Sequence, residues 1–371
     1  MEERTPLNWA RALVKGILLF AALNMLLAVI GPFEAPFGVY NRLVAGRARF
    51  PYGENSAAAY NLSLYDLGAM FAAHELDGAG AADGEFRVLV LGDSSVWGTL
   101  LRPEETLSGQ LNALGLRCGG KPARFYNLGY PTLSLAKDLM ILREGMGYQP
   151  DLILWPLTLE SFPRGRQLES PLAANNADRL GALARETNLP LAVEGLAQPT
   201  FWERTLIGRR RPAADWLRLQ LYGFAWAATG VDQDYPDTYE PAARDLEADP
   251  AYHDWLPPTL PLDELAFELL LAGMAEADGT PLVLINEPIL VSGGQNSDIR
   301  YNFYYPRWAY DQYREMLAQT CQANGWTCLD AWDRVPPERF TNTAIHMDTA
   351  GERLFAEFIY ENALAGSCQK P

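Results

Sequence analysis

The stretch Arg87–Leu101, which reads RVLVLGDSSVWGTLL, decides the fold. Its first five residues, Arg87–Leu91, form a short aliphatic and β-branched run of the kind that makes a buried strand. Gly92 then permits a tight turn that a Cβ atom would obstruct. Ser94 therefore falls at the carboxyl end of the first strand of an open α/β sheet, where such folds bind ligands. If a helix follows, its free N–H groups would point toward negative charge that develops beside Ser94.

Further apolar runs predict four more strands, and amphipathic segments between them predict helices. The expected strands are Ala123–Leu128, Asp151–Leu157, Pro281–Asn286 and Thr327–Asp330. The expected helices are Glu105–Leu114, Leu133–Met146 and Trp308–Asn324, and a last helix follows His346. Strands that alternate with helices in this way are typical of a parallel sheet.

Two motifs resemble the SGNH/GDSL hydrolase family. Gly92-Asp93-Ser94 resembles block I, in which the serine is the nucleophile. Asn342–Phe358 (NTAIHMDTAGERLFAEF) resembles block V, in which a histidine precedes the final helix. The resemblance thus implies that Ser94 is the nucleophile and His346 its general base. Without the resemblance, the first motif also fits a turn with a helix N-cap, and the second a surface-loop histidine.

The resemblance also implies an oxyanion hole, which in this family includes a block II glycine and a block III asparagine. Asn127-Leu128-Gly129 matches block II, so the N–H groups of Ser94 and Gly129 are the expected donors. Block III departs from the family, because Glu160 stands at the asparagine position, with Ser161 after it. A carboxylate cannot donate a hydrogen bond unless it is protonated. Either Ser161 or another donor replaces the asparagine, or Glu160 holds a substrate hydroxyl.

A second departure concerns the acid that orients the histidine in this family. Three residues before His346 the chain has Thr343, which carries no charge. The side chains that remain as orienting or substrate-contacting groups are Asp93, Asp330, Asp333 and Asn342. A Ser–His dyad without a third member is also open.

The first fifty residues contain one apolar segment, Gly16–Ile30, interrupted only by Asn24. As a helix, Leu13–Phe33 would extend about 31 Å, enough to span a bilayer. Three basic residues precede the segment, and the next one after it is Arg42. The positive-inside rule then leaves the N-terminus in the cytoplasm and the rest of the chain outside. A cleaved signal peptide, which Pro32 disfavours, and a buried core helix are the alternatives.

The resemblance implies a flavodoxin-like three-layer α/β/α sandwich with a parallel five-stranded sheet. We expect residues 1–33 to form a cytoplasmic tip and a transmembrane anchor, and residues 34–86 a linker with a packing helix at Ser63–Leu76. Residues 87–371 would form the SGNH-like domain, with an insertion at residues 162–279 between the third and fourth strands. The insertion is expected to be a helical subdomain with its own core, although its apolar 215–230 segment also suits a lid or a membrane-facing helix.

Composition excludes some functions. The chain has 371 residues, 49% of them hydrophobic, and a net charge of −16, which argues against nucleic-acid binding. Its four cysteines have no metal-like CxxC spacing, so no metal or other cofactor is expected. Cys321 and Cys328 flank a short link and could pair outside the cytoplasm.

An outward-facing SGNH domain on a membrane anchor resembles the proteins that add or remove acyl groups on cell-surface polysaccharides. We therefore expect a serine esterase or O-acyltransferase that acts on an acylated carbohydrate or another small ester. Its partners would be the lipid bilayer and a membrane-bound O-acyltransferase. Asn296, Arg300 and Asn302 in the loop after the fourth strand would suit a polyhydroxylated substrate. The alternatives are a non-catalytic carbohydrate-binding or assembly factor and, last, a glycosidase using Glu160 and Glu287.

Overall fold

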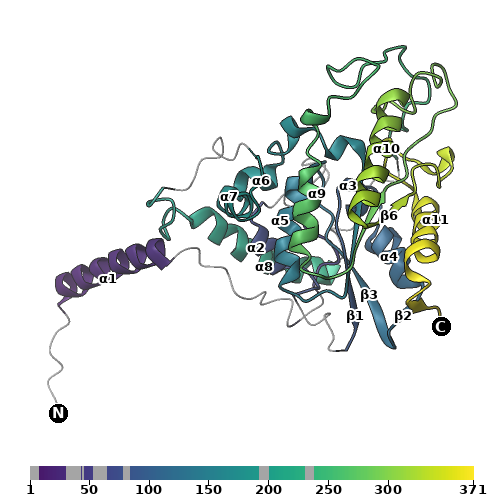
Figure 1. Cartoon of the computed structure of the whole chain (residues 1–371). Helices are drawn as coiled ribbons and strands as arrows, with labels where there is room; N and C mark the ends of the chain where they lie inside the picture. The colour runs from purple at the N-terminus through teal and green to yellow at the C-terminus, as the bar shows by residue number, and fades with distance from the viewer. Residues whose placement is uncertain are drawn as a thin grey trace.

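The computed structural model describes residues 8–30, 43, 46–52, 65–77, 84–191, 200–229 and 238–371 (Figure 1). Within these residues, seven strands form one sheet in the order β6-β5-β4-β1-β3-β2-β7. The strands are β1 (Phe86–Val90), β2 (Arg117–Cys118), β3 (Lys121–Asn127), β4 (Leu152–Leu157), β5 (Leu282–Asn286), β6 (Thr327–Asp330) and β7 (Cys368–Gln369).

The sheet is mixed, so the expectation of a five-stranded parallel sheet is wrong. The five expected strands are all present and parallel, in the order that flavodoxin-like folds use. Two short antiparallel strands extend the edge beyond β3. β2 turns back onto β3 through Gly119 and Gly120, whose φ angles of 55° and 81° suit glycine. β7 comes from the C-terminal tail and pairs with β2.

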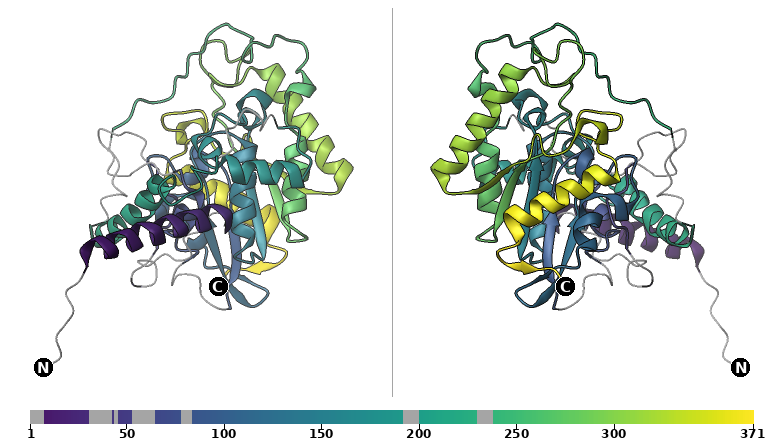
Figure 2. Two further views of the ribbon diagram at one scale, coloured as in Figure 1. Left: turned by 90° about the vertical axis from the view of Figure 1, so that its left-hand side faces the viewer. Right: turned by 90° about the vertical axis from the view of Figure 1, so that its right-hand side faces the viewer.

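Helices cover both faces of the sheet and make the three layers (Figures 1 and 2). On one face α4 (Leu107–Ala113) packs against α11 (Thr349–Ile359). On the other face lie α5 (Leu135–Met146), α9 (Glu268–Glu276) and α10 (Arg307–Asn324). The strands supply both cores by alternation: Val88 and Val90 join the α4–α11 core, and Leu89 and Leu91 join the α5–α9–α10 core.

The insertion does not form a separate subdomain core. Its helices α6 (Pro171–Asn175) and α7 (Ala177–Glu186) bury leucines in the same core as α5, and α9 packs directly on α5. One side of α8 (Arg210–Thr229) rests on α2 (Leu67–Phe71). The insertion packs against the sheet domain, so its apolar side chains are buried in the core of that domain and not in a core of their own. Residues 192–199 and 230–237 lie outside the described residues.

The N-terminal segment forms the 22-residue helix α1 (Trp9–Ile30), about 33 Å long. It is long and apolar enough to cross a bilayer, a property that anchors and signal sequences share. The expected packing helix at Ser63–Leu76 is shorter than predicted, because Asp66 caps the five-residue α2. Most of the expected linker at residues 34–64 lies outside the described residues.

The remaining short helices lie at turns of the chain. They are α3 (Ser94–Trp97), η2 (Pro103–Glu105), η3 (Leu159–Ser161), η4 (Arg164–Arg166), η7 (Leu262–Glu264), η8 (Pro337–Arg339) and the π-helical η9 (Tyr360–Leu364). Of these, α3 and η3 follow the carboxyl ends of the neighbouring strands β1 and β4, so both border the same end of the sheet.

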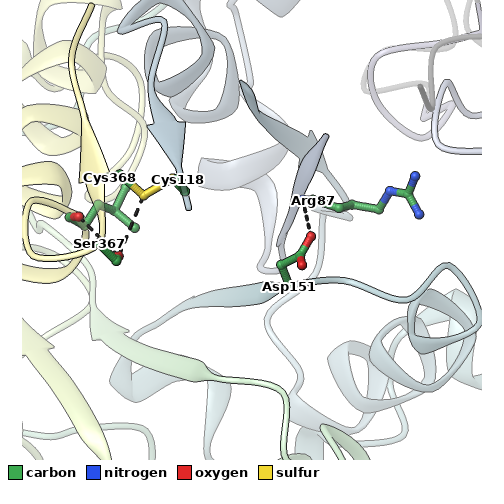
Figure 3. Close-up of a disulfide and its surroundings, with 6 residues drawn as sticks. Arg87, Cys118, Asp151, Ser367 and Cys368 are labelled. Atoms are coloured by element: carbon green, nitrogen blue, oxygen red, sulfur yellow. Dashed lines mark hydrogen bonds between the residues drawn. A yellow bond between two sulfur atoms is a disulfide. The ribbon is translucent and has the colours of Figure 1, made fainter. Parts of the chain in front are cut away.

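Two disulfides pair all four cysteines. Cys321 and Cys328 join the end of α10 to β6, as expected for an exported domain. The second disulfide, Cys118–Cys368, was not foreseen and fastens β7 to β2 (Figure 3). It closes a loop of 250 residues, so it ties the C-terminus to the middle of the chain. Disulfides of this kind persist in oxidising compartments.

We expect the double substitution Cys118→Ala/Cys368→Ala to lower the free energy of unfolding by about 2–5 kcal/mol. The chain-entropy effect of a crosslink grows with loop length, so Cys321→Ala/Cys328→Ala, with a separation of only 7, should cost less. Urea denaturation of the two variants makes the comparison. A larger loss from the short-loop pair would contradict this account.

Candidate active site

The turn after β1 places Ser94 at the carboxyl end of the parallel strands. Gly92 has φ 144°, and a Cβ there would lie 2.5 Å from Val96, so only glycine fits this turn. Asp93 is the N-cap of α3 and accepts a hydrogen bond from the Ser95 amide at 2.7 Å. Ser94 is the first residue of that helix, and no hydrogen bond from its own amide is found among the described residues. This amide is therefore available to a ligand.

Ser94 and His346 meet across 252 positions of sequence. The Ser94 hydroxyl lies 2.7 Å from Nε2 of His346, and Nδ1 of His346 lies 2.9 Å from Oδ1 of Asn342. The three side chains form a Ser–His–Asn triad. Because Asn342 Oδ1 can only accept, Nδ1 carries the proton and Nε2 is left to accept from Ser94. This is the tautomer that a general base for Ser94 requires.

The loop before α11 holds His346 in this position. Thr343 Oγ1 accepts from the His346 amide at 3.1 Å, and the Thr341 amide donates to the His346 carbonyl at 2.8 Å. Asp348 then caps α11 by accepting from Gly351 at 2.8 Å. Burial lowers the pKa of His346 to about 4, so the imidazole is neutral at pH 7. A neutral imidazole is ready to accept a proton.

Of the expected orienting residues, the structure brings only Asn342 to the imidazole. Asp330, at the end of β6, instead pairs with Arg314 at 2.6 Å and accepts from Asn286 at 2.8 Å. The family's acidic position, Thr343, fixes the loop backbone through its hydroxyl. The amide oxygen of Asn342 is therefore the group that contacts Nδ1 of His346.

The neighbouring Ser95 forms a hydrogen bond to a buried carboxyl group. Its hydroxyl donates to Glu287 Oε2 at the carboxyl end of β5. Glu287 is buried, and desolvation together with the nearby charge of Asp93 raises its pKa well above the ordinary value. The sequence suggests Glu287 only as a glycosidase carboxylate, although its place directly after β5 indicates a position at the same end of the sheet as Ser94. The hydroxyl of Ser95 thus bonds to Glu287, whereas the hydroxyl of Ser94 bonds to His346.

The expected oxyanion donor Gly129 has its amide engaged. The Gly129 N–H donates to Asn127 Oδ1 at 3.0 Å. The glycine itself is required for close packing, since a Cβ would lie 2.4 Å from the Trp97 nitrogen. The Tyr130 amide donates to the Gly92 carbonyl at 3.0 Å. Thr132 follows two residues later and has a φ angle of 143°. Among the described residues no hydrogen bond from the Thr132 amide is found, so it is the first free N–H after β3.

Glu160 belongs to an internal ion-pair cluster. Arg166 pairs with its carboxylate, the Tyr252 hydroxyl donates to Oε2 at 2.9 Å, and His253 Nε2 lies 3.1 Å from the same oxygen. These contacts join η3 to the insertion and neutralise the charge that would oppose an oxyanion. Ser161 is buried, and its amide donates to the Thr158 carbonyl at 2.9 Å.

With Glu160 and Glu287 each bound elsewhere, the structure offers no support for a glycosidase pair. The polar residues of the 287–305 loop are also structural. Arg300 donates to five backbone carbonyls, Asn302 is fully buried, and Asn296 donates to the Leu246 carbonyl at 2.7 Å. The expectation that they contact a polyhydroxylated substrate is therefore wrong. These side chains satisfy backbone carbonyls of the loop itself and of the neighbouring segment 246–251.

Lys137 supports the loops that carry Ser94 and Thr132, and no local sequence pattern predicts this role. Its fully buried ammonium donates to the carbonyls of Gly92 at 2.7 Å and Tyr130 at 2.9 Å. It also pairs with Asp138 at 2.6 Å. Gly92 leads into Ser94, and Tyr130 leads into Thr132. One side chain of α5 thus ties together the two loops that carry the free amides.

We expect Lys137→Met to lower the free energy of unfolding by about 3–5 kcal/mol, because it leaves the buried carboxylate of Asp138 without its cation. Lys121→Met at the exposed start of β3 is the matched control and should change stability by less than about 0.5 kcal/mol. Guanidinium denaturation measures both. Equal, small losses from the two variants would show that the brace does not stabilise the fold.

Comparison with known proteins finds similarity to solved structures only. No family model matches the chain, and no curated protein matches it. Solved structures do match, among them a protein assigned to the G-D-S-L lipolytic family from Desulfitobacterium hafniense, with 11% identity over 75% of this chain and 99% of that one and a TM-score of 0.32. A carbohydrate acetylesterase from Sinorhizobium meliloti has 13% identity over 76% of this chain and 99% of its own, with a TM-score of 0.31.

An aryl esterase from M. smegmatis matches with 13% identity over 74% of this chain and 99% of its own, with a TM-score of 0.30. The family named for the first of these structures is the one that the sequence motifs resemble. Identities and TM-scores at this level carry no activity from those proteins to this chain. The functional argument therefore rests on the geometry of Ser94, His346 and Asn342.

Proposed function

We propose that this chain is a serine esterase of the SGNH type that acts on acyl esters. The observation that carries the proposal is the continuous hydrogen-bonded line from Ser94 through His346 to Asn342. A nucleophile, a neutral base and a group that orients the base are the parts that acyl transfer needs. A non-catalytic binding protein has no need of this line.

In the first half of the reaction, Ser94 Oγ attacks the acyl carbonyl while its proton passes to Nε2 of His346. The carbonyl electrons move to oxygen, and the amides of Ser94 and Thr132 would bind this oxyanion. We assign Thr132 in place of Gly129, because the Gly129 amide already donates to Asn127. The tetrahedral intermediate then collapses, the C–O bond to the alcohol breaks, and His346 gives its proton to the leaving oxygen. An acyl–Ser94 ester remains.

In the second half, water attacks the acyl–Ser94 ester after losing a proton to His346. Collapse releases the carboxylic acid and returns the proton to Ser94 Oγ, which restores the site. If a sugar hydroxyl attacks instead, the same steps transfer the acyl group. Hydrolysis is the proposal, and transfer to a carbohydrate is its nearest alternative.

We further propose that α1 is an uncleaved anchor and that the catalytic domain faces away from the cytoplasm. Support comes from the length of α1 and from the two disulfides, which persist in oxidising compartments. A domain held there would meet acylated cell-surface polysaccharide, and a membrane-bound O-acyltransferase would be a partner on the same surface.

The proposal is tested by following the fate of the acyl group. The purified full-length protein is incubated with an acetylated oligosaccharide, with and without excess unacetylated oligosaccharide. Release of acetate in both cases supports the esterase. Acetyl transfer to the added oligosaccharide with little free acetate would make the protein an acyltransferase. Neither product, with any of several acyl esters, would favour a binding protein.

A further inference from the structure

The segment Thr200–Thr229 exposes large apolar side chains beside α1. Trp202 is 74% exposed and Ile207 55%, in the turn that leads into α8. On α8 itself, Leu217 is 54% exposed and Leu221 64%. Figures 1 and 2 show this segment next to α1. Large apolar side chains that are exposed together on a protein surface mark a contact with a partner or a membrane.

Helix α8 is apolar on two opposite sides. Leu219 and Gly223 are buried and lie one turn apart on the side that faces the protein. Leu217 and Leu221 lie one turn apart on the opposite side. A surface helix needs only one apolar stripe, whereas a helix with apolar residues on opposite sides requires an apolar environment on both.

The contact between this segment and α1 determines how deep the segment would lie in a membrane that α1 spans. The candidate span runs from Trp9 to Val29, so Asn24 lies inside it, about 8 Å from the outer end. Asn24 donates to the Phe20 carbonyl at 2.8 Å and accepts from the Ile207 amide at 3.2 Å. A polar side chain in a membrane helix faces protein where one is present. If α1 spans the bilayer, the turn at Ile207 therefore reaches the level of the outer acyl chains.

The charge of the segment also favours contact with a lipid bilayer. The segment has five arginines against two acidic residues, although the whole chain carries a net charge of −16. Arg204 and Arg210 are exposed in or next to the apolar turn. Arginines and tryptophans that flank an apolar surface are typical of segments that lie in the interface of a bilayer with anionic lipids.

We propose that Thr200–Thr229 is a second membrane contact, which lies in the outer interface of the bilayer alongside α1. The turn at Trp202–Ile207 and the outer side of α8 would enter the lipid, and the arginines would meet the phosphate groups. This inference rests on the proposed anchoring of α1 and is independent of the proposed esterase chemistry. Two contacts instead of one would fix the orientation of the catalytic domain over the membrane.

The test uses single cysteine variants of the full-length protein in vesicles of phosphatidylcholine with one-fifth phosphatidylglycerol. All four native cysteines are disulfide-bonded, so an added cysteine is the only free thiol for a nitrobenzoxadiazole label. Leu221→Cys reports the proposed contact, and Leu19→Cys reports the anchor. Leu262→Cys is the matched control, because Leu262 is 55% exposed but lies on η7, which leads into α9 and not into the segment beside α1. Lipids that carry a nitroxide on the acyl chain quench only labels that enter the bilayer.

We expect strong quenching at Leu221 and Leu19 and none at Leu262, with Leu221 quenched more by shallow than by deep nitroxides. Quenching at Leu19 without quenching at Leu221 would overturn the second contact and leave the anchor intact; a protein partner on α8 would give this result. Absence of quenching at both positions would overturn the anchor and the contact together. Ester hydrolysis by the same samples shows that the variants are folded and reports the esterase proposal separately.

Discussion

Ser94→Ala is expected to lower kcat/KM for a small acyl ester by about 10⁴–10⁶-fold, the range seen when a serine nucleophile is removed. The alanine keeps the turn, the cap and the fold, because Asp93 supplies the cap and the Ser94 hydroxyl bonds, among the described residues, only to His346. Steady-state hydrolysis of a p-nitrophenyl ester measures the loss. Activity that remains within tenfold of the native protein would exclude Ser94 as the nucleophile.

Ser95→Ala is the matched control for that substitution. Ser95 is the rival nucleophile in sequence, but its hydroxyl is bonded to Glu287 beneath the site. The substitution leaves a buried carboxyl group without its donor, so we expect a lower melting temperature and much of the activity retained at 25 °C. Loss of activity without loss of folded protein would reverse the roles of the two serines.

His346→Ala is expected to lower kcat by about 10²–10⁴-fold, the usual contribution of a general base. Without the imidazole, no group within hydrogen-bond distance of Ser94 Oγ among the described residues can take its proton. His253→Ala is the control, since His253 bonds to Glu160 in the insertion. A similar loss in both variants would indicate that structural damage, and not a missing base, lowers the rate.

The pH dependence distinguishes an Asn-supported base from an Asp-supported one. Burial holds the pKa of His346 at about 4, and only the neutral imidazole accepts a proton, so native kcat/KM should fall only as the pH approaches 4. In Asn342→Asp, a carboxylate 2.9 Å from Nδ1 would stabilise the protonated imidazole and raise this pKa. The acid limb should then move to higher pH by about 1–3 pH units. An unchanged limb would show that Asn342 does not act on His346.

The sequence was sufficient to predict the parallel part of the sheet and the meeting of Ser94 with His346. Five strands could be read from local apolar runs, and Ser94 and His346 from motifs whose glycines and caps are local features. The topology then places both at the carboxyl edge of the sheet, so a large separation in sequence was no obstacle.

The supporting groups could not be predicted in this way, because tertiary contacts create them. Lys137 looks like any lysine on an amphipathic helix until α5 packs beneath β1 and β3. The outermost pairing, of β7 with β2, brings together Cys118 and Cys368, which the sequence indicates only by elimination once Cys321 and Cys328 are paired. Glu160 looked like a charge opposed to catalysis, because its partner Arg166 was not recognised.

The measurement that tests the central claim most directly is the mass of the intact protein after incubation with a fluorophosphonate, followed by mapping of the modified peptide. A serine activated by His346 displaces fluoride from phosphorus and keeps the phosphonyl group, so the protein gains the mass of one adduct. The account predicts a single adduct on Ser94, formed by the native protein and by Ser95→Ala, and lost in Ser94→Ala and His346→Ala. Folded native protein that forms no adduct, or forms one on a different residue, would contradict it.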